Sequence, residues 1–324
     1  MDRAAAALAA TVLTCAVAAA GCGVGPGESS EGEATLTVTR DFGAEALASG
    51  TLEDPTESDT VVRFLDANAD IDTDYGGNFV SAIDGLEGST VNGGADDWFF
   101  FVNGIYSEIG AGESKVHVGD RVWWDYRMWR EAYRVPAVVG SWPEPFVHGY
   151  DGEERPVVVE CVTPEAAACD EVAGALEDAG AEPEREDAGR PVEHPDSIRV
   201  LVGPWASLRE DRAARQLESG PSTSGVYATA EACDGGWNLE ILGDDGRPRE
   251  VLTDGGLVAA VREGTDEPTW IVTAASDADL AGAAELVDGE TLANRYAVAA
   301  AAGGEPQPVP LPADEPLVES GGCA

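Results

Sequence analysis

The stretch from Asp96 to Tyr126 reads DDWFFFVNGIYSEIGAGESKVHVGDRVWWDY, two aromatic strand patterns joined by a glycine-punctuated loop. Successive side chains of a strand point to opposite faces of its sheet. Trp124 and Tyr126 therefore share one face of the second strand, and Trp123 lies on the other. The first strand is apolar on both faces, because Trp and Phe fill positions 98 to 101. A sheet that is apolar on both faces needs two covers.

Shorter patterns upstream complete a first domain. Alternating residues predict a strand at Thr35–Thr39, the spacing of apolar residues predicts a helix over Val61–Ala69, and another strand is predicted at Phe79–Ile83. One helix among about four strands is typical of a β-grasp-like sheet, so we expect such a domain over residues 35–150. The second cover of its sheet is the segment after Tyr126, a second domain, or a ligand.

Four motifs in this domain occur in a recognisable order: Val102-Asn103-Gly104 at the end of the aromatic strand, Gly110-Ala111, Gly119-Asp120, and the closing Trp124-Asp125-Tyr126. This order resembles the family of unknown function related to the C-terminal domain of transcobalamin. The segment RVPAVVGSWPEPFVHG (Arg134–Gly149) is similar to an extension of actinobacterial surface lipoproteins that contain this domain. No enzymatic activity is associated with this family. The resemblance implies a vitamin-like or corrinoid-like small molecule as the class of ligand.

Strand-helix units indicate a second α+β domain over residues 151–302. Strand patterns at PVVVEC, IRVLVG and TWIVTA (residues 156–161, 198–203 and 269–274) are each followed by a predicted helix, at Pro164–Ala179, Pro204–Ser219 and Asp277–Val287. Between the last two units, strands 237–242 and 248–252 flank Gly-Asp-Asp-Gly and are predicted to form a hairpin. The Pro-rich and Gly-rich residues 303–324 are predicted to be disordered.

The N-terminus has the features of an export signal. An apolar run from Ala4 to Gly21 contains no charge and ends in small residues before Cys22. We expect residues 1–21 to be a lipoprotein signal peptide, Cys22 to be lipidated, and residues 22–34 to be a flexible tether. The mature protein is then anchored in the membrane by lipid, on the outer face of the cytoplasmic membrane.

Cysteine content agrees with export. Without Cys15 and Cys22, four cysteines remain, an even number that suits an oxidising compartment. We predict a disulfide between Cys161, at the end of a strand, and Cys169, in the helix that follows. Cys233 and Cys323 are then left as a pair by parity alone.

The composition is strongly acidic, with 61 Asp and Glu against 19 Lys and Arg and a net charge of -42. Such a surface repels nucleic acid, which we exclude as a partner. Residues 121–150 differ from the rest, because four arginines and eight aromatic residues accompany only three acids. If the face opposite Trp124 binds a flat or ring-containing ligand, the candidate ligand-binding residues are Trp123, Trp129, Trp142, Phe146 and His148.

No pattern indicates catalysis or a resident cofactor. The acidic stretch Asp66–Gly77 resembles a calcium loop, but Ile71 stands where the turn glycine belongs and Gly77 where the bidentate Glu belongs. Gly-x-Ser-x-Gly is absent from the sequence, and no free thiol is expected. We therefore expect a non-catalytic surface lipoprotein, without metal or cofactor, that binds a small molecule or presents it to a membrane transport protein. The alternative is an assembly lipoprotein that docks a protein through its aromatic region.

Overall fold

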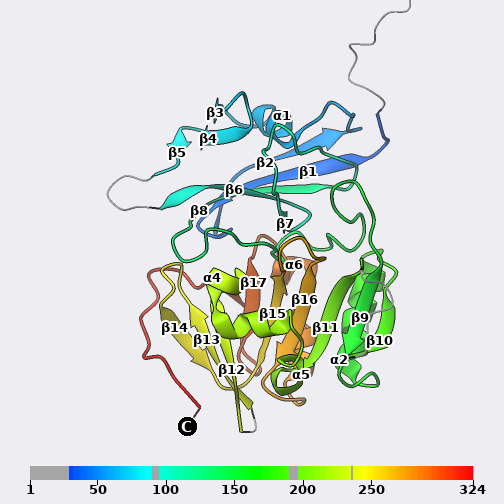
Figure 1. Ribbon diagram of the computed structural model, residues 1–324, viewed down its shortest axis with the longest axis vertical. Coiled ribbons are helices and arrows are strands. Elements are labelled where there is room, and N and C mark those ends of the chain that lie inside the picture. The colour runs from blue at the N-terminus through cyan, green and yellow to red at the C-terminus, as the bar shows by residue number, and fades with distance from the viewer. Residues whose placement is uncertain (1–28, 90–94, 190–195, 235, 324) are drawn as a thin grey trace, which may run out of the picture.

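The computed structural model describes residues 29–89, 95–189, 196–234 and 236–323. Figure 1 shows two parts stacked along the long axis, a first domain in blue to cyan above and a second domain in green to red below. The predicted signal peptide and the predicted lipidation site Cys22 lie outside the described residues. Within the described ranges, no helix is long and apolar enough to span a membrane.

A five-stranded sheet forms the first domain, in the order β2-β1-β8-β6-β7. Its strands are β1 (Glu33–Arg40), β2 (Glu45–Glu53), β6 (Asp96–Val102), β7 (Ile105–Tyr106) and β8 (Arg121–Met128). β1 and β8 pair in parallel at the centre, and the other neighbours pair antiparallel. Together with the strands and helices of the second domain, this sheet confirms the predicted α+β class.

One face of this sheet is covered by helix α1 (Val61–Asp66) and by a small sheet. The small sheet consists of β3 (Ile71–Asp74), β4 (Phe79–Ile83) and β5 (Leu86–Glu87). Trp124 is buried here and its ring stacks on Phe100 at 4.8 Å. Tyr126 is half-buried on the same face and donates its hydroxyl to the carbonyl oxygen of Glu87. The predicted alternation of β8 is confirmed, and these rings stabilise the first core.

The second domain is built on a seven-stranded sheet in the order β10-β9-β11-β16-β15-β17-β18. Its strands are β9 (Val157–Cys161), β10 (Glu184–Asp187), β11 (Ile198–Pro204), β15 (Gly256–Val261), β16 (Thr269–Ala274), β17 (Ala297–Ala300) and β18 (Gln307–Val309). β10, β9, β11 and β16 are parallel to one another, and β15, β17 and β18 complete the sheet with antiparallel pairs.

Both faces of this second sheet are buried. Helices α2 (Ala167–Asp178), α5 (Leu280–Ala284) and α6 (Gly289–Leu292) pack on one face. The other face carries α3 (Trp205–Leu208), η2 (Ala214–Ser219), α4 (Pro221–Ser224) and a second small sheet of β12 (Ala228–Cys233), β13 (Gly236–Leu242) and β14 (Pro248–Leu252). The predicted hairpin is confirmed by the antiparallel pair β13 and β14.

The predicted helices are shorter than the sequence pattern suggested. The first begins at Ala167 instead of Pro164, because the Ala166 amide donates to the carbonyl oxygen of Thr163 and closes a turn there. The second is broken after Leu208. The carboxylate of Asp211 accepts hydrogen bonds from two backbone amides ahead of it and pairs with Arg199, which starts a separate turn. The third is reduced to α5, Leu280–Ala284, and α6 follows beyond the end of the predicted helix at Val287.

The C-terminal segment is ordered, contrary to the prediction of disorder from residue 303. Strand β18 pairs with β17, and the amide of Gly321 donates to Glu240. Two disulfides are present, the predicted Cys161–Cys169 bond and a Cys233–Cys323 bond, with Cα–Cα distances of 6.1 and 5.3 Å. The second bond attaches the end of the chain to β12. Disulfides of this kind fit an exported protein.

The remaining face of the first sheet is covered by protein. Trp123 is only 2% exposed, and its ring lies 5.5 Å from Phe101 and 5.3 Å from Tyr296 of the second domain. Residues of the segment after β8, including Val135 and Val138, join the same core. Of the three covers considered from sequence, the segment after Tyr126 and the second domain together fill this position.

A buried carboxylate lies at the centre of this interface. Asp125 accepts hydrogen bonds from the hydroxyl of Thr39, the hydroxyl of Tyr296 and the amide of Gly43. Burial raises the pKa of Asp125 to about 6, although these three donors and the more distant Arg127 oppose the shift. The folded protein therefore binds a proton here more tightly than the unfolded chain does.

We expect Asp125→Asn to flatten part of the pH dependence of stability. A carboxyl group with a raised folded-state pKa stabilises the fold at low pH, and this contribution is lost as pH rises through about 6. Between pH 5 and 7.5 the native protein should lose roughly 1 kcal/mol relative to the variant. Urea unfolding of both proteins at the two pH values measures this difference. If the difference in unfolding free energy between the native protein and the variant were the same at pH 5 and pH 7.5, the expectation would be contradicted.

Candidate functional site

Three of the five predicted ligand-binding residues lie inside protein cores. Trp142 and Phe146 pack on Trp270 of β16, with ring centroids 5.9 and 4.9 Å apart, and belong to the core under the second sheet. Trp123 is enclosed at the domain interface. The sequence interpretation of these rings as ligand-binding residues is therefore corrected, because protein supplies the apolar cover for which a ligand was one of three alternatives.

The other two predicted residues remain partly exposed but do not meet. Trp129 follows the end of β8, and its ring makes an edge contact with Tyr133 at 5.7 Å. His148 packs against Gly119, just before the start of β8, and its Nδ1 lies 2.6 Å from Oε1 of Glu144. The length of β8 separates the two side chains, so the five predicted residues do not form one surface.

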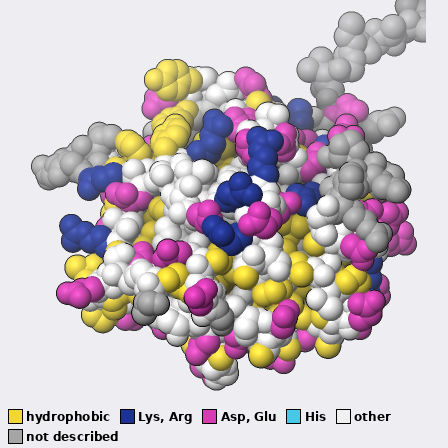
Figure 2. Space-filling view, turned by 60° about the horizontal axis from the view of Figure 1, so that its bottom comes forward, with side chains coloured by type: hydrophobic (Ala, Val, Ile, Leu, Met, Phe, Trp, Pro, Cys, Tyr) yellow, Lys and Arg dark blue, Asp and Glu magenta, His cyan; other side chains and the backbone are white. Residues whose placement is uncertain are grey.

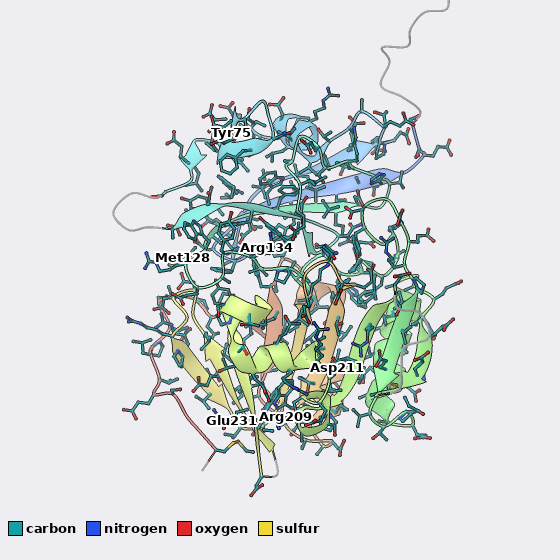
Figure 3. The ribbon with its side chains drawn as sticks, in the orientation of Figure 1. Tyr75, Met128, Arg134, Arg209, Asp211 and Glu231 are labelled. Carbon is teal, nitrogen blue, oxygen red and sulfur yellow. A yellow bond between two sulfur atoms is a disulfide. The ribbon has the colours of Figure 1, made fainter. Side chains whose placement is uncertain are left out.

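A cleft between the two domains is the best candidate for a small-molecule site. Its volume is about 530 Å³. The first domain contributes β7 and residues from the loop 107–117, and the second side is formed by Tyr150, Asp151, Arg262 and Thr265. Figure 3 shows Arg134, which pairs with the lining residue Glu108 at 3.0 Å, at the junction of the domains. Clefts of this size at domain interfaces are typical ligand sites.

Tyr150 forms one wall of this cleft and is held in place on three sides. The guanidinium carbons of Arg155 and Arg262 lie 4.9 and 5.3 Å from its ring centroid, and its hydroxyl donates a short hydrogen bond to Glu267. Burial and this hydrogen bond raise the pKa of Tyr150 to about 12, so the phenol stays neutral. An ordered aromatic ring beside a cation offers a ligand both apolar and polar contacts.

Two cations in the cleft have no carboxylate partner among the described residues. Lys115 donates to the carbonyl oxygen of Glu57 at 2.7 Å. Arg262 donates to the carbonyl oxygens of Asp266 and Thr265 and to the hydroxyl of Tyr150. Figure 2 shows acidic side chains scattered widely over one face of the molecule and fewer basic ones among them. Two cations without a carboxylate partner among the described residues thus face the same cleft.

His117 also lines the cleft, and its charge is tied to a neighbour. Its Nδ1 lies 3.4 Å from a carboxylate oxygen of Asp120. That buried carboxylate raises the pKa of His117, so the imidazolium is favoured at neutral pH more than in a free histidine. Asp120 itself also accepts from the amide of His117 and from the Asn103 side chain, which anchors this corner of the cleft.

Two other clefts are less suggestive of a ligand. One, of about 470 Å³, adjoins the first through Arg262 and Thr265, but its arginines 199 and 212 are paired with acids. Another, of about 670 Å³, lies on residues 41–44, 293–295 and 308–314 and is lined by Asp41, Asp244 and Asp314. Its acidic lining is what the overall composition already leads one to expect.

Sequence analysis missed this cleft because its walls come from distant segments. Arg262 and Tyr150 are 112 positions apart. The available signal was Lys115, the single lysine of the chain. Within the described ranges, no group of three or more His, Cys, Asp or Glu side chains is arranged to hold a metal ion. The calcium-like stretch is divided between α1 and β3.

Comparisons with known proteins concern the first domain. Residues 58–128, from before α1 to the end of β8, match the family described as a domain of unknown function, DUF4430. A crystal structure of a "putative metal binding protein" from Ruminococcus gnavus ATCC 29149 is similar at 18% sequence identity and a TM-score of 0.23, covering 30% of this chain and 98% of that one. No curated protein matches the chain. The transcobalamin-like resemblance stays a prediction.

Proposed function

We propose that this protein is an exported, non-catalytic binding protein that holds a small molecule in the cleft between its two domains. The observation that supports this best is the cleft itself, about 530 Å³ in volume, with walls from β7, from the loop 107–117 and from the second domain. The volume lies within the range of small-molecule sites, and the lining combines apolar and aromatic side chains with polar and charged ones.

The location at the membrane is part of the same proposal. A lipid on Cys22 would hold the protein on the outer face of the cytoplasmic membrane, where it could deliver its ligand to a transport protein. The predicted tether of residues 22–34 overlaps β1, which begins at Glu33, so the tether is shorter than expected. A vitamin-like or corrinoid-like ligand remains the class that the transcobalamin-like resemblance favours.

Replacing Ile109 by alanine is expected to weaken the binding of an apolar probe roughly three- to tenfold, because each buried CH₂ group lost removes about 0.8 kcal/mol. Ile109 lines the cleft and is 50% exposed. The probe is N-phenyl-1-naphthylamine, whose fluorescence rises on transfer from water to an apolar site. Leu47→Ala is the matched control, since Leu47 is 40% exposed and lies on β2 outside the cleft.

Cobalamin and cobinamide are then titrated as competitors of the bound probe. Displacement by either supports the vitamin-like class. Failure of the native protein to bind the probe saturably, or an equal loss of binding in the Leu47 control, would contradict a small-molecule site in this cleft.

The alternative function, docking of a protein partner, is favoured by one observation. Tyr133 is 62% exposed, and its ring contacts Phe99 and Trp129 at 6.2 and 5.7 Å, so an aromatic group lies at the surface of the predicted docking region. A stoichiometric partner recovered from membranes and lost in Tyr133→Ala would support it. Tyr75→Ala is the control, because Tyr75 is 86% exposed and lies at the far end of the first domain (Figure 3).

A further inference from the structure

We propose that the ligand of the interdomain cleft is a singly charged organic anion, whose negative group binds to Lys115 of the first domain and Arg262 of the second, while its apolar part lies against Ile105, Tyr106 and Ile109. This assignment rests on the proposed function of the cleft. It adds the chemical class of the ligand and the two residues that select it.

The first argument is that two cations without a carboxylate partner among the described residues line the same cleft. The chain has 61 acidic residues against 19 Lys and Arg. Several arginines of the described residues form ion pairs, among them Arg40 with Glu45, Arg185 with Asp170 and Arg209 with Glu218. Arg63 and Arg215 donate to carbonyl oxygens instead, but neither lines the cleft. Lys115 and Arg262 bond only to carbonyl and hydroxyl oxygens, although both line the same cleft.

The second argument is that donors on both cations remain available. Lys115 uses one hydrogen bond, to the carbonyl oxygen of Glu57, and an ammonium group has three donors. Arg262 is held by carbonyl oxygens through Nε and one Nη, and its other Nη forms no hydrogen bond within the described residues. Its guanidinium also lies over the Tyr150 ring. Arg262 is therefore oriented without being neutralised, as an anion site requires.

The acids of the cleft limit the charge of the ligand. Glu108 is neutralised by Arg134, and nearby Glu267 by Arg155. Glu113 accepts a hydrogen bond from an amide, and neither it nor Asp151 forms an ion pair among the described residues. Two unpaired acids thus accompany the two unpaired cations. Their repulsion disfavours polyphosphates and other multiply charged anions, whereas one carboxylate or sulfonate can approach Lys115 and Arg262.

The apolar wall explains why the anion should be organic. Ile105 is 5% exposed and Ile109 is 50% exposed, and both line the cleft beside Tyr106. A small inorganic anion would leave Ile109 and the exposed part of Tyr106 in water, whereas a ring or an alkyl chain would cover them. Burial of that surface contributes about 25 cal/mol per Å².

The test compares two probes that differ by one negative charge: 8-anilinonaphthalene-1-sulfonate and the uncharged N-phenyl-1-naphthylamine. The native protein should bind the sulfonate about tenfold more tightly, because charge-assisted hydrogen bonds add to the shared apolar contact. Without local cations, a protein of net charge -42 would instead disfavour the anionic probe. Pyrophosphate should not displace the sulfonate.

The variants Lys115→Gln and Arg262→Gln should each weaken sulfonate binding several-fold, and should weaken binding of the neutral probe much less. Arg262→Lys, which keeps the charge, should retain part of the preference. Arg63→Gln is the matched control, since Arg63 also donates only to a carbonyl oxygen, that of Ser58, but lies on α1 outside the cleft.

The outcomes separate this assignment from the proposed function. Equal affinity of the native protein for the two probes, or unchanged sulfonate binding in Lys115→Gln, overturns the anion assignment while the cleft remains a binding site. Displacement of the sulfonate by pyrophosphate overturns the restriction to a single charge. If neither probe binds, both the assignment and the proposed function fail.

Discussion

Replacement of Cys233 and Cys323 together by alanine is expected to lower the free energy of unfolding by about 4.6 kcal/mol in the chain-entropy model. The bond joins residues 90 positions apart, so it strongly restricts the unfolded chain. It also fixes the last residues against β12, where Cys323 is exposed and adds little packing. Urea unfolding followed by tryptophan fluorescence measures the loss.

The Cys161–Cys169 bond provides the comparison. Its sequence separation is only 8, for which the same model gives about 2.6 kcal/mol. Both sulfur-bearing residues are 1% exposed, and any cavity left by alanine adds to that loss. A larger loss from the Cys161 and Cys169 pair, after correction for the cavity, would contradict the ranking by loop length.

Replacement of Trp123 by alanine is expected to destabilise the fold by about 3 to 5 kcal/mol. The ring is 2% exposed, its Nε1 donates to the hydroxyl of Thr39 at 2.8 Å, and it contacts Tyr296 across the domain interface. The variant loses this packing and leaves a cavity between the domains. Thermal and urea unfolding of the variant report the effect.

Trp129→Ala is the control for this substitution, because Trp129 is only partly buried and its truncation should cost roughly 1 kcal/mol. Binding of N-phenyl-1-naphthylamine by the folded fraction should survive the loss of Trp123. If stability were unchanged and probe binding were lost, Trp123 would be a ligand contact, as the sequence first suggested, and not an interface residue.

The local sequence pattern was sufficient to predict those strands and helices that are determined by their own residues. The alternation in β8 correctly separated Trp124 from Trp123, since the period of a strand leaves no freedom once one face is buried. β2 was missed because its sequence, EALASGTLE, has mostly exposed small and polar residues and little alternation of apolar side chains. A strand of this kind is specified by its pairing with β1.

Features that depend on distant partners could not be predicted. The helix expected at Pro204–Ser219 is interrupted near Asp211, which forms a salt bridge with Arg199. Arg199 in turn pairs with Glu160 of β9, which is distant in the sequence. The tail is ordered by β17 and by Cys233, and its composition contains no sign of either. Propensity yields to such tertiary contacts.

The candidate site illustrates the same limit. Sequence correctly required a second cover for the aromatic strands, but could not choose between protein and ligand. The cover is protein, and the open cleft lies beside it, where the loop 107–117 approaches Arg262. Whether a cation of that cleft is free to bind an anion depends on its salt-bridge partners, and these can be read only from the structure.

The bond between Tyr296 and Asp125 has a consequence for the newly made chain. The two residues are 171 positions apart, and the N-terminal one emerges first. The first sheet can form around Trp124 early, yet Phe101 and Trp123 lack their ring contacts with Tyr296 until residue 296 has been synthesised. During that interval the apolar side of the first sheet is less completely covered than in the finished protein.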